Sequence, residues 1–147
     1  MDLITKIFEM KRNIQMLHIG SRLQLPPTSE TGTLLAIWEL TQGQTSPGIR
    51  VSELAGLLCV SVPTVSRCLQ KFTDKGYIQK TLNEQDKRGT YISLTAEGDA
   101  LCRQVREAIN ALLLRVQARL DPAELEQFCA TMDKIYTAVS EELPKEP

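Results

Sequence analysis

The residues with the most informative chemistry lie between positions 61 and 71. At about 100° per residue along a helix, their polar side chains face away from a stripe of apolar ones. Hydroxyl and amide groups can hydrogen-bond to base edges, and Arg and Lys bind bases or phosphates. The polar set is Ser61, Pro63, Thr64, Ser66, Arg67, Gln70 and Lys71. Its chemistry suits recognition in a DNA major groove, although an ordinary solvated helix face has the same pattern.

Catalytic and metal-binding chemistry have little support. His18 is the only histidine and is far in sequence from any candidate nucleophile, so we expect it on a helix surface or a pocket wall. The four cysteines include no C-x-x-C pair, which argues against a structural zinc site. Neither a Gly-rich phosphate loop nor a dinucleotide-binding fingerprint is present. We therefore expect no enzymatic activity, no metal and no cofactor.

The cysteines leave a redox role open. Cys59 is expected in a turn near a helix dipole, and Cys68 follows Arg67, so each is a candidate reactive thiol. Cys102 flanks the apolar stripe of one helix, and Cys129 is expected in the core on the stripe of another.

Two short amphipathic helices would position the polar residues. In the first, leucines recur at i, i+3 and i+4, Ala55 allows a close helix crossing, and Ser52 is placed to cap the first turn. In the second, Ser61 is the expected cap, Pro63 lies in the first turn, and Gly76 follows the end. The expected buried side of the second helix is Val62, Val65, Leu69 and Phe72. Residues 51–78 thus predict a helix-turn-helix.

A β-hairpin is expected directly after these helices. Residues 77–82 and 90–94 have strand-like composition, and the segment between them is polar and ends at Gly89. Such a hairpin tip is called a wing. Its Lys87 and Arg88 can enter a narrow minor groove, while Asp86 is placed to hold one of them in position.

Three further apolar stripes flank this head. The N-terminal stripe runs from Leu3 to Leu17 and its segment ends at Pro26 and Pro27, before a helix over about 28–42 and a loop at 43–48. A short strand at 49–51 is expected beside the wing. Thr95 can cap a long helix that reaches about residue 120, and Asp121 can cap the last helix. One small head cannot cover all three stripes, so the terminal helices should pair in a homodimer.

The chain length and the distribution of charge agree with a DNA-binding head flanked by dimerisation helices. The chain has 147 residues, 42% of them hydrophobic, and a formal net charge of −1. Residues 49–94 hold seven Lys or Arg and four Asp or Glu, a net of +3, whereas residues 95–147 hold six and ten, a net of −4. Positive charge therefore gathers on the candidate DNA-reading head. No signal peptide or long apolar run is present, so we expect a soluble, cytoplasmic protein without a membrane segment.

The chain resembles the MarR family of transcriptional regulators over nearly all of its length. The motifs that carry this resemblance are VSELAGLLCVSVPTVSRCLQKFTDKGYI and DKRGTYISLTAEG, the second of which is similar to the family pattern D-x-R…LT-x-x-G. The resemblance implies a mainly α fold with a small β-hairpin wing, and a homodimer that binds double-stranded DNA at a pseudo-palindromic operator. Cys59 departs from the pattern, because glycine is common at that turn position.

The expected organisation is a single domain over residues 1–147. Within it, about 28–95 form the winged helix-turn-helix head, and about 1–27 and 96–143 form dimerisation helices. The expected function is a DNA-binding regulator, a repressor that a small-molecule effector releases from its operator. Two alternatives remain open: a thiol-based redox sensor on the same fold, which uses Cys59 or Cys68, and a winged helix that binds proteins.

Overall fold

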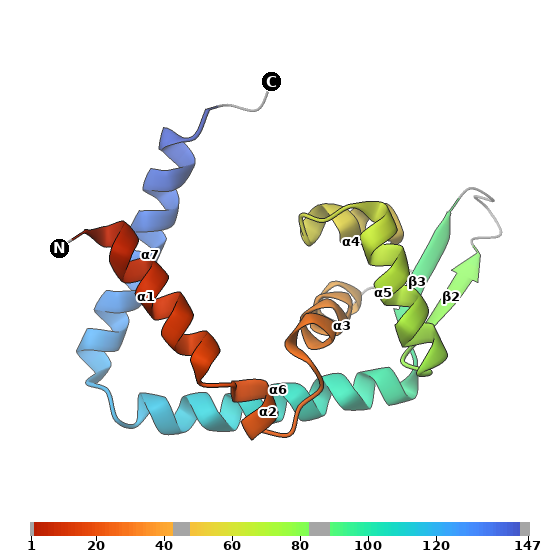
Figure 1. Cartoon of the computed structure of the whole chain (residues 1–147), viewed down its shortest axis with the longest axis horizontal. Coiled ribbons are helices and arrows are strands. Elements are labelled where there is room, and N and C mark those ends of the chain that lie inside the picture. The colour runs from red at the N-terminus through yellow and green to blue at the C-terminus, as the bar shows by residue number, and fades with distance from the viewer. Residues whose placement is uncertain (1, 43–47, 83–88, 145–147) are drawn as a thin grey trace. The chain divides into compact units, whose positions relative to one another are not determined.

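The computed structural model describes residues 2–42, 48–82 and 89–144. Its elements are α1 (Leu3–Met16), α2 (Ile19–Arg22), α3 (Thr28–Thr41), β1 (Ile49–Arg50), α4 (Val51–Leu57), α5 (Val62–Asp74), β2 (Ile78–Leu82), β3 (Thr90–Leu94), α6 (Ala96–Gln117) and α7 (Pro122–Glu142) (Figure 1). The chain divides into two compact units, Met1–Arg106 and Glu107–Pro147. The expected mainly helical fold with a small sheet is confirmed.

The sheet is three-stranded and antiparallel, in the order β1-β3-β2. The pairing of β2 with β3 sets Ile78 opposite Leu94, and that of β1 with β3 sets Ile49 opposite Ile92. Both the predicted hairpin and the predicted short strand beside it are therefore confirmed. Residues 83–88, which include the predicted wing tip, lie outside the described residues.

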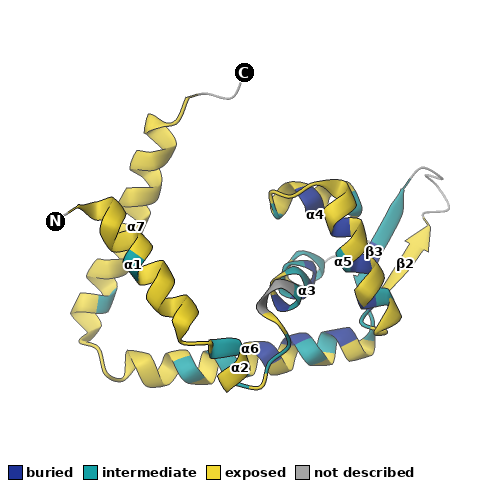
Figure 2. Ribbon diagram, in the orientation of Figure 1, coloured by how far each residue is buried: buried dark blue, intermediate teal, exposed yellow. Residues whose placement is uncertain are grey.

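One hydrophobic core holds the head together. Its members are Leu34, Ile37, Ile49, Leu54, Ala55, Val65, Leu69, Phe72, Ile78, Ile92 and Cys102. These side chains come from α3, α4, α5, the sheet and the first half of α6, where Figure 2 shows the buried positions. Burying a side chain such as Phe72 contributes about 1.5–3 kcal/mol. Cys102 is itself a core residue, rather than a neighbour of the α6 stripe as predicted.

The helix starts follow the predicted caps with one exception. Ser61 accepts a hydrogen bond from the Thr64 backbone N–H at 3.4 Å, and Asp121 accepts one from Ala123 at 2.7 Å, so both predicted caps are confirmed. The prediction of Ser52 as the cap of α4 is wrong. The extended residue before that helix is Arg50, and its backbone N–H donates to Glu53 at 2.9 Å. Since β1 runs directly into α4, the last strand residue occupies the capping position.

Thr95 joins three elements. Its hydroxyl accepts a hydrogen bond from the backbone N–H of Gly98 at 3.1 Å, which caps α6 as predicted. The same hydroxyl donates to the Gly76 carbonyl at 2.6 Å, just after α5. The start of α6 is thereby tied to the end of α5. At its other end α6 stops at Gln117, slightly before the predicted limit.

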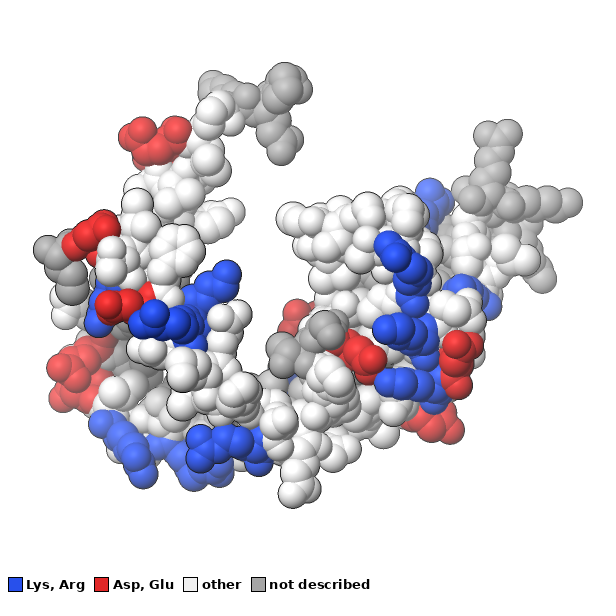
Figure 3. Space-filling view, viewed as in Figure 1, with Lys and Arg blue, Asp and Glu red and all other residues white. Residues whose placement is uncertain are grey.

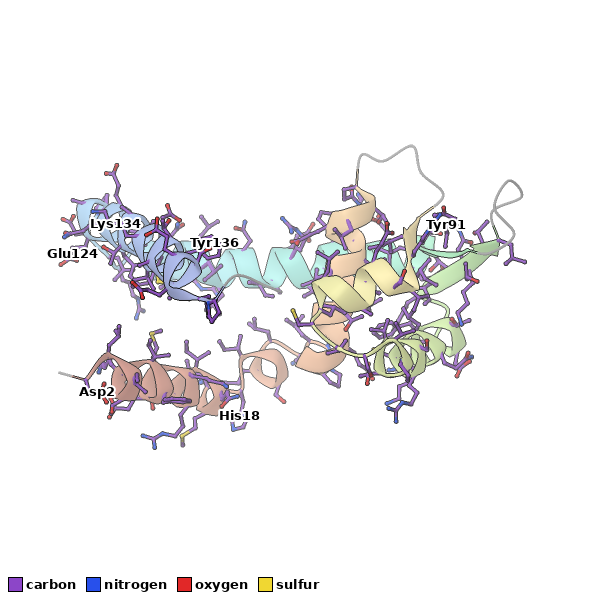
Figure 4. All side chains as sticks on the ribbon, turned by 90° about the horizontal axis from the view of Figure 1, so that it is seen from above. Asp2, His18, Tyr91, Glu124, Lys134 and Tyr136 are labelled. Carbon is purple, nitrogen blue, oxygen red and sulfur yellow. The ribbon has the colours of Figure 1, made fainter. Side chains whose placement is uncertain are left out.

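The N-terminal segment, which was predicted to end at Pro26 and Pro27, forms two helices, and the first of them matches the predicted apolar stripe from Leu3 to Leu17. α1 ends at Met16, and His18 adopts a left-handed conformation with φ of 47° before α2 begins (Figure 4). α2 ends at Arg22, the second left-handed residue Gln24 follows Leu23, and the Leu25 N–H closes the turn on the Gly20 carbonyl at 2.8 Å. Both breaks precede Pro26 and Pro27.

The apolar stripes of α1 and α7 are exposed in this chain (Figure 2). On α7 the exposed apolar side chains include Phe128, Met132, Ile135, Tyr136 and Val139. Cys129, which was predicted to be in the core, is exposed with them, because no described segment of its own unit covers this side of the helix.

Within the described residues, no single helix has the length and apolar composition needed to cross a membrane. Only α4 and α5 taken together, with a bend of 111° between them, pass that test.

Candidate nucleic-acid interface

The recognition helix α5 is anchored on one side only. Val65, Leu69 and Phe72 are buried, in accord with the prediction. Every residue of the predicted polar face is exposed: Ser61, Pro63, Thr64, Ser66, Arg67, Gln70 and Lys71. The sequence periodicity therefore assigned this face correctly, and the core beneath α5 fixes the direction in which it points.

The N-terminal end of α5 is internally hydrogen-bonded. The Ser61 hydroxyl lies 2.8 Å from the Thr64 hydroxyl and also accepts from the Thr64 backbone N–H. This pair organises the first turn of the helix. Because each hydroxyl has a single hydrogen, only one of the two remains available to donate to a base.

Two cations follow along the exposed face. The Arg67 guanidinium is steadied by a 3.4 Å hydrogen bond from Nε to the Pro63 carbonyl, and Lys71 lies one turn further on. Lys75, just past the helix end, instead donates to Glu30 of α3 at 2.8 Å, which raises the pKa of that lysine. Figure 3 shows Lys and Arg gathered along α5. Arg67 and Lys71 are thus the cations best placed for phosphates or bases.

Val62 does not lie on the buried side of α5. It was predicted to be covered, but 47% of it is exposed, and Val60 in the preceding turn is 42% exposed. Val62 is the first residue of the helix, so no earlier helical turn covers it, and α4 leaves it open. In the sequence, this exposure could have been expected because Val62 directly follows the N-cap residue Ser61.

The base of the wing carries an Arg–Tyr pair that the sequence pattern did not predict. The Arg50 guanidinium lies over the Tyr91 ring, 5.5 Å from its centre, and donates to the Tyr91 hydroxyl at 3.1 Å (Figure 4). Arg50 precedes α4 and Tyr91 lies on β3, so the pair joins the helix-turn-helix to the return strand of the wing. The predicted tip residues Asp86, Lys87 and Arg88 lie outside the described residues.

The cysteines differ widely in exposure. Cys59 is exposed in the turn with φ of 53°, the left-handed region in which glycine is favoured, and Cys68 is half-buried. Burial raises the pKa of Cys102 to about 11, and its Sγ donates weakly to the Leu34 carbonyl at 3.6 Å. Redox chemistry at Cys59 or Cys68 stays a prediction.

Open pockets lie on the surface of Met1–Arg106. One, of about 590 Å³, is lined by residues of α1, α2 and the Pro26–Pro27 segment, and His18 forms part of its wall. Another, of about 680 Å³, is lined by Arg50, Tyr91 and the exposed side of α4. Among the described residues, no group of three or more His, Cys, Asp or Glu side chains is arranged to hold a metal ion.

Comparison with known sequences finds similarity over part of the head. A family model described as "MarR family" matches residues 40–90. The HTH-type transcriptional repressor Rv2887 of Mycobacterium tuberculosis is 29% identical over 90 residues, which are 61% of this chain and 65% of that protein. The multiple antibiotic resistance protein MarR of Salmonella typhimurium is 36% identical over 55 residues, 37% of this chain and 38% of its own length. The aligned region therefore spans less than two thirds of the length of these relatives.

Solved structures share the fold over most of the chain. The Staphylococcus aureus MepR–DNA complex covers 94% of this chain and 99% of its own, with a TM-score of 0.73 and 21% identity. Streptococcus pneumoniae FabT in complex with DNA covers 94% of this chain and 93% of its own, with a TM-score of 0.71 and 23% identity. The chain therefore shares the fold of these solved structures, and its resemblance to the MarR family is confirmed over residues 40–90.

Proposed function

We propose that this chain, whose residues 40–90 match the MarR family model, is a sequence-specific DNA-binding regulator that inserts α5 into the major groove of its operator. The observation that carries this proposal is the two-sidedness of α5. Three buried side chains fix the helix on the core, and its exposed side presents the capped N-terminus, Arg67 and Lys71.

The wing supplies the second proposed contact. Arg88 and Lys87 reach the minor groove, and Asp86 steadies the guanidinium of Arg88 through a charge-assisted hydrogen bond. The Arg50–Tyr91 pair supports this proposal, because it stiffens the strand from which the wing extends.

A homodimer would place two such heads on one operator. The exposed apolar stripes of α1 and α7 supply the surface for it, since large apolar faces of this kind are covered in stable proteins. A two-fold dimer reads an inverted repeat whose half-sites lie roughly one helical turn apart, about 10 base pairs.

The regulator is proposed to act as a repressor that a small-molecule effector releases. Rv2887 is named as a repressor, which supports this direction of control. The pocket lined by α1, α2 and the two prolines is large enough for a small organic molecule, for which sites of about 300–1,000 Å³ are usual. An effector that binds there would change the conformation of the segment that connects α1 and α2 to the head.

The test is binding of the full-length protein to genomic DNA fragments, including the DNA upstream of its own gene, at two salt concentrations. Arg67→Ala should weaken binding by about 1–3 kcal/mol and relax the preference at particular base pairs. Lys71→Ala should weaken all sequences more evenly and reduce the salt slope by about 0.9 for each phosphate that the protein no longer neutralises.

Arg103→Ala is the matched control, because it removes an exposed cation of the same unit that lies on α6. It should leave the affinity nearly unchanged. Equal binding by wild type, Arg67→Ala and Lys71→Ala would show that α5 does not face DNA, and a protein partner would then become the better hypothesis.

A further inference from the structure

The tip of the recognition helix is unusually apolar for a surface that meets water. Val62 and Val60 are both close to half exposed, whereas Val65, one turn along, is 2% exposed. They flank the N-cap Ser61, and Pro63 follows without an N–H to donate. The end of α5 therefore presents methyl groups where its sequence suggests a polar surface.

The neighbouring hydroxyls are partly engaged with each other. Ser61 and Thr64 hydrogen-bond to each other at 2.8 Å, and Ser61 also caps the Thr64 backbone N–H. Because each hydroxyl has a single hydrogen, one donor is used inside the helix start and one is left for base edges.

We propose that Val62, with Val60 beside it in the turn, recognises the 5-methyl groups of thymine in the major groove. The inference rests on the proposed DNA binding and names the bases that the N-terminal end of α5 selects. Residues at the N-terminus of a recognition helix contact base edges directly, and thymine is distinguished in the major groove by its methyl group.

Duplex DNA fits this tip better than a protein does. The cations Arg67 and Lys71 lie further along the same helix, on its other side at about 100° per residue. A major groove surrounds the end of an inserted helix, so a duplex that contacts Val62 also brings phosphates close to both charges, whereas a protein that covered Val62 alone would leave them unpaired. The exposed surface of two valine side chains is also far smaller than the roughly 800 Å² of surface that one partner buries in a stable protein interface.

The expected size of the effect follows from one methyl group. Burying a single methyl or methylene group changes an equilibrium by about fourfold. Each thymine that Val62 contacts should therefore change the dissociation constant by about that factor when its methyl group is removed.

The experiment begins with a fragment that the full-length protein selects from genomic DNA. Each thymine of the site is replaced in turn by deoxyuridine, which pairs identically but lacks the methyl group. Dissociation constants are measured for wild type, Val62→Ala, Val60→Ala and Val62→Thr. Threonine has the shape of valine, so Val62→Thr should keep the fold. Circular dichroism checks the folding of each variant.

The inference predicts that deoxyuridine weakens wild-type binding about fourfold at one or more positions, and that this penalty disappears in Val62→Ala. Arg103→Ala again serves as the control, because Arg103 is an exposed residue of α6, and its variant should keep the full deoxyuridine penalty.

Specific binding without a deoxyuridine penalty at any position would overturn the inference and leave the proposed function standing. A penalty that persists in Val62→Ala and Val60→Ala would also overturn it, because another side chain would then read the methyl group. Failure to select any sequence would overturn the proposed DNA binding itself, and the inference with it.

Discussion

Gly98 is the residue at which α6 approaches the sheet most tightly. A Cβ built at this position would overlap the carbonyl of Tyr77, which is the residue before β2. That same carbonyl accepts a hydrogen bond from the Thr95 N–H at 3.0 Å, so it has little freedom to move. The glycine in the LT-x-x-G motif is therefore explained by close approach of the backbone.

Gly98→Ala should lower the free energy of unfolding by about 2–3 kcal/mol, since the clash is with backbone rather than with a flexible side chain. Gly32→Ala is the control, because a Cβ at Gly32 on α3 meets nothing within 4 Å. That variant should raise the stability slightly, by up to about 1 kcal/mol. Urea unfolding of both variants measures the difference, and equal stabilities would contradict the close approach.

At the scale of elements, α3 and α6 are joined by a polar seam over their apolar contact. The Trp38 indole N–H donates to Asp99 at 2.8 Å, and the Arg106 guanidinium stacks 4.6 Å above the centre of the indole ring. Arg106 also pairs with Glu39 at 3.2 Å. The seam fixes the first half of α6 to the head.

Trp38→Phe removes the hydrogen bond to Asp99 and part of the ring surface that packs on the core, so it should lower the free energy of unfolding by about 1–3 kcal/mol. Arg103→Ala removes the other partner of Asp99, an exposed i,i+4 pair, and should cost less, about 0.3–0.5 kcal/mol. Denaturant unfolding followed by circular dichroism compares them. A larger destabilisation in Arg103→Ala would contradict the importance of the indole bond.

The elements that the sequence predicted well are those set by local chemistry. The Ser61 and Asp121 caps, the α5 polar face and the pairing of β2 with β3 depend on spacings of a few residues, and all are confirmed. The failures depend on tertiary coverage. Periodicity places Val62 on the apolar side of α5, but whether a neighbour covers the first helical residue depends on where α4 lies.

The same limit accounts for Ser52 and Cys102. Ser52 is a good capping residue, but the pairing of β1 with β3 brings the strand up to Arg50 and sets the helix start there. Cys102 looks marginal on a helical wheel, and it is buried because α3 covers that part of α6. Long-range packing carries information that a single amphipathic pattern lacks.

At the scale of the whole molecule, the exposed stripes of α1 and α7 predict self-association. Met132→Glu should weaken the proposed homodimer, because it places a charge among exposed apolar residues that a second copy would bury. Lys134→Glu changes an exposed residue of the same helix and is the control. Sedimentation at micromolar concentration reports the change. A wild-type monomer that still binds DNA through one head would contradict the dimer.

The pairing of β1 with β3 also governs how the head is made on the ribosome. Ile49 cannot pair with Ile92 until that residue, which lies 43 positions later in the chain, has been synthesised. At about 5–20 residues per second, translation leaves β1 without its neighbour for roughly 2–9 s. During that interval α4 and α5 can form, but the three-stranded sheet that shares a core with Leu69 and Phe72 cannot. The recognition helix α5 is thus synthesised before the sheet can complete the core against it, and slow codons between residues 75 and 92 would lengthen its exposure to chaperones and proteases.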